Sequence, residues 1–117
     1  MFDDPRFAVD AVPPRRRPRH HLRDALLTLA GPHARLLGHQ EKSWASITFA
    51  GTHHRLELLF EGAEAVAAGE LFIAFLPEHE FDLPGRLVAD ATVTDVDHRL
   101  DPPLMRVTCE LLVLDER

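Results

Sequence analysis

Histidine is the enriched residue type with catalytic or metal-binding chemistry in this 117-residue chain. Neutral imidazole binds transition metals and acts as a general base near neutral pH. The chain has eight histidines: His20, His21, His33, His39, His53, His54, His79 and His98. None has the H-E-x-x-H or H-x-H spacing that brings two rings together, and adjacent histidines on a strand point to opposite faces. We therefore expect solvated loop histidines, with no dedicated metal site and no cofactor.

The segment Glu78-His79-Glu80-Phe81-Asp82 is the best candidate for a catalytic site. It groups three carboxylates with one imidazole, and a carboxylate that accepts the ring proton orients a histidine base. A small hydrolase or isomerase using His79 with Glu78, Glu80 or Asp82, joined by His53 or His54, is therefore one hypothesis. The favoured interpretation is a solvated connector, because loops of this composition usually only link elements.

Nucleophilic catalysis finds little support elsewhere in the sequence. Cys109 is the single cysteine, so no intramolecular disulfide can form, and we expect its thiol to lie inward on the last strand. Ser43 and Ser46 lack the G-x-S-x-G elbow of a serine nucleophile. The six glycines are scattered and form no phosphate-binding loop. An enzyme is therefore the weaker expectation.

Two segments have the periodicity of helices. Leu22, Ala25, Leu26 and Leu29 recur on one face of a helix over residues 19–29, which Gly31-Pro32 ends. Residues 62–76 form the second candidate and end at Pro77. Its apolar face would hold Ala63, Val66, Ala67, Ile73 and Ala74. A strand over residues 71–76 is the competing interpretation, because short apolar runs are ambiguous.

Two pairs of alternating segments predict β-hairpins. Residues 44–49 and 55–60 alternate on either side of Gly51-Thr52. Leu87, Ala89, Ala91 and Val93 alternate with more polar residues, as do residues 105–113, with a turn inside 97–103. The chain is therefore predicted to be α+β, ordered αββαββ, with a four-stranded antiparallel sheet and both helices packed on one face.

The predicted register leaves apolar side chains on the sheet face opposite the helices. These are Trp44, Leu59, Leu112 and Leu114. An exposed apolar face usually marks a partner or ligand surface, so we expect a non-enzymatic binding module, or a homodimer formed through the sheet face. A one-residue slip of the register would invert this assignment.

Charge is distributed unevenly along the chain. Residues 1–23 carry a net charge of +3 and residues 24–117 a net charge of −9. The acidic body disfavours nucleic acid as a partner, although the cluster Arg15-Arg16-Arg17-Pro18-Arg19 leaves an accessory role in phosphate binding as a third hypothesis. We expect residues 1–18 to be a disordered arm and residues 19–117 to be a single domain.

Composition also bears on source and compartment. Arginine strongly outnumbers lysine, a bias typical of GC-rich bacterial genomes. No apolar run is long enough to span a membrane, and the first residues lack the pattern of a secretory signal, so we expect a cytoplasmic protein without a membrane partner.

Overall fold

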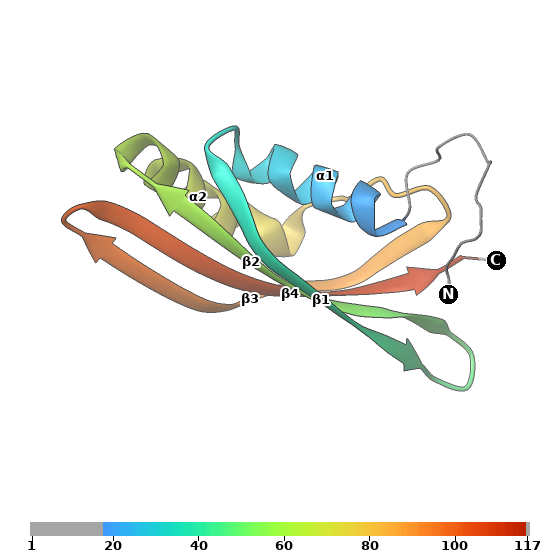
Figure 1. The fold of residues 1–117 in the computed structure, drawn as a ribbon. Helices are drawn as coiled ribbons and strands as arrows, with labels where there is room; N and C mark the ends of the chain where they lie inside the picture. Colours follow the sequence, from blue (N-terminus) through green and yellow to red (C-terminus); the bar gives the residue numbers. More distant parts are fainter. Residues whose placement is uncertain (1–17, 117) are drawn as a thin grey trace, which may run out of the picture.

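A computed structural model describes residues 18–116 as two helices packed on one sheet (Figure 1). The order is α1 (Pro18–Ala30), β1 (Ala34–Ala45), β2 (Ala50–Glu61), α2 (Ala63–Phe75), a 3-10 turn η1 (Leu76–Glu78), β3 (Arg86–Leu100) and β4 (Pro103–Asp115). The four strands form one antiparallel sheet in the order β1-β2-β4-β3, with both helices on the same side. This confirms the predicted αββαββ architecture. The expected N-terminal arm lies outside the described residues except for Pro18.

The first hairpin turns earlier than the sequence predicts. Its turn spans residues 46–49, where the Ser46 N–H donates to the Phe49 carbonyl at 2.8 Å and the Phe49 N–H donates to Ser46 Oγ at 3.1 Å. The predicted strand over residues 45–49 and turn at Gly51-Thr52 are therefore wrong. Gly51 lies inside β2, where it pairs with Leu114. A side chain does not fit at this position, because a Cβ would collide with the Val113 carbonyl and lie 2.9 Å from Leu114 Cα.

The second hairpin matches the predicted segments but contains irregularities. β3 has register shifts between Val88 and Asp90 and between Val93 and Asp95. Each bulge inserts one unpaired residue and resets the alternation of side chains. As a result Leu87 points away from the helices, whereas Ala91 packs on the core. The expectation that Leu87 and Ala91 share a face is wrong for this reason.

The core lies between the helices and the two central strands. α1 buries Leu22, Leu26 and Ala30, three residues of one helical face. The strands supply Leu56, Leu58, Phe60, Met105, Val107, Cys109 and Leu111, all 1% exposed or less. Alternate residues of β2 and β4 therefore point toward the helices, and the residues between them point the other way.

α2 uses a different face from the one predicted. It buries Ala65, Val66, Gly69 and Phe72, whereas most of the predicted set is exposed. A Cβ at Gly69 would lie 2.9 Å from Phe60 Cγ, so this glycine lets the helix axis approach the sheet. The helix also extends through residues 71–75, which excludes the competing strand interpretation. Within the described residues, no helix is both long and apolar enough to cross a membrane.

Candidate functional site

Both helices cover the same side of the sheet, and we call the uncovered side opposite them the open face (Figure 1). Cross-strand pairing places its side chains in rows. One row joins Trp44, Gly51, Leu114 and Leu87. The next open-face row joins Lys42, His53, Leu112 and Asp90. The rows that follow contain Gln40, Arg55, Glu110 and Thr92, then Glu57, Thr108 and Asp95, and finally Arg35, Leu59, Arg106 and Asp97.

The four apolar residues singled out from the sequence all lie on the open face, but they do not form one patch. Leu59 pairs with Arg106, whereas Leu114 pairs with Gly51 at the other end of β2. Eight residues of extended strand separate the two positions, about 27 Å. Leu59 is therefore an isolated apolar residue, and Trp44, Leu112 and Leu114 gather at the opposite end. Leu59 and Leu114 are each only 9% exposed and offer little surface to a partner, whereas Trp44 and Leu112 are half-buried.

The apolar end contains residues that the sequence analysis did not select. Phe49 and Leu87 are each about half exposed (52%) beside Leu114, where they help to line a groove of about 400 Å³. Trp44 pairs with Gly51, so the neighbouring strand presents no side chain beside it. The turn at residues 46–49 and the bulge in β3 create this end, and neither was visible in the sequence.

Charge divides the rest of the open face into two halves. β1 carries Lys42 and Arg35, whereas the opposite edge strand β3 carries Asp90, Asp95 and Asp97. Arg35 lies 3.4 Å from Glu61 and Asp97 lies 3.8 Å from Arg99, so these charges are balanced within the chain. Near the centre, His53 Nε2 lies 3.3 Å from Glu110 Oε1. The β1 edge is therefore basic through Lys42, the β3 edge is acidic through Asp90 and Asp95, and the strands between them carry both signs.

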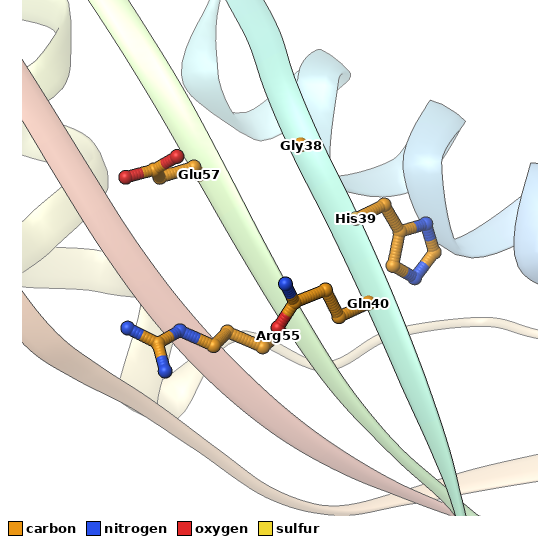
Figure 2. A pocket seen from close by; sticks show the side chains of 5 residues that line it. All are labelled: Gly38, His39, Gln40, Arg55 and Glu57. Carbon is orange, nitrogen blue, oxygen red and sulfur yellow. The ribbon is translucent and has the colours of Figure 1, made fainter.

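A shallow depression of about 300 Å³ lies where β1 has its bulge (Figure 2). Gln40, Arg55 and Glu57 project from the open face around it, whereas the His39 ring points toward α1. The open-face side chains that line the depression are all polar. This suits a polar surface of a partner better than an apolar ligand.

On the helix side, three side chains form a hydrogen-bonded chain that links α1 to the sheet. Arg23 Nε donates to His39 Nδ1 at 2.8 Å, and His39 Nε2 lies 2.8 Å from His54 Nδ1. A guanidinium can only donate, so neutral His39 carries its proton on Nε2 and donates it to His54. Burial lowers the pKa of His54, the nearby His53 lowers it further, and Glu41 opposes the shift.

The same cluster contains residue types that could bind a metal or act as a general base. Ligand atoms of His39, Glu41 and His54 lie within 4.8 Å of one another. A metal on His39 Nε2 would require the ring proton on Nδ1, where Arg23 already donates. Both nitrogens of His39 are thus committed to hydrogen bonds, so the arrangement fits a structural relay better than a metal centre or a base. The hairpin register that joins these histidines could not be read from their spacing.

The predicted catalytic segment lies in the loop after α2. Glu78, His79, Glu80 and Asp82 are all exposed, and the His79 ring meets Phe81 edge-on with centroids 4.6 Å apart. Leu83 is buried beneath them. The catalytic hypothesis for this segment stays a prediction.

Cys109 lies in the core of the sheet. It is fully buried, and burial raises the pKa of its thiol to about 12. The thiolate needed for nucleophilic attack is therefore scarce at neutral pH.

Comparison with known proteins identifies no relative of this chain. No protein-family model, curated protein or solved structure is significantly similar to the chain. The open face is therefore the feature of the molecule that bears most on its function.

Proposed function

We propose that the protein is a non-enzymatic self-associating module whose open face binds a second copy of the chain. The distribution of charge on that face supports this most strongly. One edge is basic through Lys42 and the other is acidic through Asp90, so the basic edge of one copy can pair with the acidic edge of a second copy. A surface that carries both signs in separate halves is self-complementary, whereas a face of one sign would repel its copy.

The size of the face suits a stable dimer. β2 and β4 pair over eleven positions. With a rise of about 3.4 Å per residue and about 4.8 Å between four strands, the footprint is roughly 700 Å². A standard protein interface buries about 800 Å² per partner, and side chains add to the flat footprint. The apolar end with Trp44, Phe49 and Leu87 supplies the hydrophobic part that such interfaces need.

We further propose that the protein acts in the cytoplasm of a bacterium. The excess of arginine supports the source, and a single buried cysteine suits a reducing compartment. The acidic body supports a protein partner over nucleic acid.

Light scattering during size-exclusion chromatography tests the proposal on the untagged full chain, whose monomer mass is 13.2 kDa. We expect twice this mass, falling toward the monomer on dilution. Leu112→Lys places a charge in the open face and should shift the protein to monomer. Leu71→Lys is the matched control, because Leu71 is exposed on α2, away from the sheet. A wild-type protein that stays monomeric at high concentration would contradict the proposed self-association through the open face.

A further inference from the structure

We infer that two copies pack face to face around a two-fold axis that runs parallel to the strands, between β2 and β4. This inference rests on the proposed self-association and specifies its geometry. It follows from the order of residues in the rows of the open face. The axis also explains why the two edges of the sheet carry opposite charge.

Pairing of sheet edges is the first alternative, and the strands disfavour it. β3 has two register shifts and carries Asp90, Asp95 and Asp97. β1, the other edge, has a shift between Leu36 and Gly38. Bulges and charged side chains on an edge strand prevent the regular pairing that would extend a sheet into a second copy. Association through the face remains.

A two-fold axis in the plane between two facing sheets can run along the strands or across them. An axis across the strands, through the central row, would set Arg55 against Arg55 and Glu110 against Glu110. An axis along the strands exchanges β2 with β4, so Arg55 of each copy faces Glu110 of the other. Like charges in contact disfavour the first arrangement, so the charges favour the axis along the strands.

The same axis exchanges the two edges of the sheet. β1 of one copy then lies over β3 of the other, and rows at the same level meet. Lys42 faces the partner's Asp90. Arg35 also lies opposite the partner's Asp97, but within one chain Arg35 already pairs with Glu61 and Asp97 with Arg99, so Lys42 carries the argument. At the apolar end Trp44 faces the partner's Leu87. Basic groups on the β1 edge therefore meet acidic groups, and the apolar ends coincide.

The contact between Lys42 and the partner's Asp90 should tolerate the rotation between two packed sheets. Aligned sheets lie about 10 Å apart with strands rotated by about 30°. Lys42 is one row from Arg55, near the centre of the face, where such a rotation displaces facing residues by only about 5 Å. A lysine side chain spans that displacement, whereas rows at the ends of the strands drift further apart.

Charge reversal at Lys42 and Asp90 tests this axis. Within one chain these residues lie on opposite edges, three strand spacings or about 14 Å apart, so they do not pair with each other. Lys42→Glu alone and Asp90→Lys alone each create two like-charge contacts per dimer, and we expect each to weaken self-association about tenfold or more. An equimolar mixture of the two variants should form heterodimers, because the reversed charges of one copy then match those of the other.

The mixture is analysed by native mass spectrometry, with one variant of each mixture fully labelled with heavy nitrogen so that heterodimers and homodimers differ in mass. The matched control mixes Lys42→Glu with Glu70→Lys, whose position is exposed on α2. We expect a heterodimer with affinity near that of the wild type only in the first mixture, because the control heterodimer keeps one like-charge contact and the Glu70→Lys chains pair with each other instead. A wild-type dimer whose variants show no preference for the heterodimer would overturn this axis but not self-association. A monomeric wild type would overturn the proposed function as well.

Discussion

His54 makes the stability of the fold depend on pH in a direction that can be worked out. Burial lowers its pKa below the ordinary value of 6.5, with His53 adding to the shift and Glu41 opposing it. Between the two pKa values the unfolded chain binds a proton that the folded chain does not. Stability is therefore unaffected well above pH 6.5 and falls as the pH drops below it.

The size of this effect follows from proton linkage for one group. From pH 7.5 to 5.5, one histidine with an ordinary pKa of 6.5 in the unfolded chain can cost at most about 1.4 kcal/mol of unfolding free energy. For a domain of this size such a loss lowers Tm by roughly 5–10 °C. Protonated His54 carries a proton on Nδ1 and can no longer accept the hydrogen bond from His39 Nε2, so acid breaks the link between α1 and the sheet.

The assay is urea unfolding at several pH values, compared with His54→Asn. Asparagine offers a carbonyl oxygen near the position of Nδ1, so it can accept from His39 without titrating. The variant's lower baseline stability does not matter, because the slope against pH is compared. Protein concentration is held fixed, since association also stabilises the fold. Parallel pH profiles of the two proteins would refute the reasoning, as would a wild type that gains stability in acid.

Three further predictions concern stability and reactivity. Gly51→Ala should cost about 1–3 kcal/mol of unfolding free energy by thermal melting, because the new Cβ meets the Val113 carbonyl, whereas Gly38→Ala has only a contact at 3.9 Å and should change little. A large loss at the control position alone would contradict this. Cys109 should resist a thiol reagent at pH 8 until the protein unfolds, and rapid labelling of the native protein would show that the core opens. His79→Ala should leave Tm nearly unchanged, because the ring is exposed; a drop of several degrees would mean that it packs more tightly than its exposure indicates.

Local patterns predicted the architecture well. The i, i+3, i+4 spacing of Leu22 and Leu26 identified α1, and alternation identified β4 with Cys109 pointing inward. These signals come from one element at a time. α2 shows the limit of this approach, since a helix that is apolar on all sides has no periodicity, and Gly69 marks its buried face only through contact with Phe60.

Features set by neighbouring strands could not be predicted. Gly51 resembled a turn residue, yet it is required by the approach of β2 to β4. Leu87 changed faces because of a bulge at the next positions. The contact of His39 with His54 depends on the register of the first hairpin. A turn at Gly51-Thr52, as the sequence predicts, gives a different register in which the two histidines do not meet. Alternation along the strands predicted that Trp44 lies on the open face. The separation of that face into an apolar end and two oppositely charged edges could be seen only once the strands were paired.

Trp44 offers the most direct measurement of the proposed interface, because it is the single tryptophan and lies at the apolar end of the open face. Its quenching by acrylamide is followed through a dilution series in which the mass is measured in parallel. We predict that quenching rises as the dimer dissociates, with the same midpoint as the fall in mass. Quenching that stays constant while the mass halves, or a mass that is monomeric throughout, would contradict association through this face.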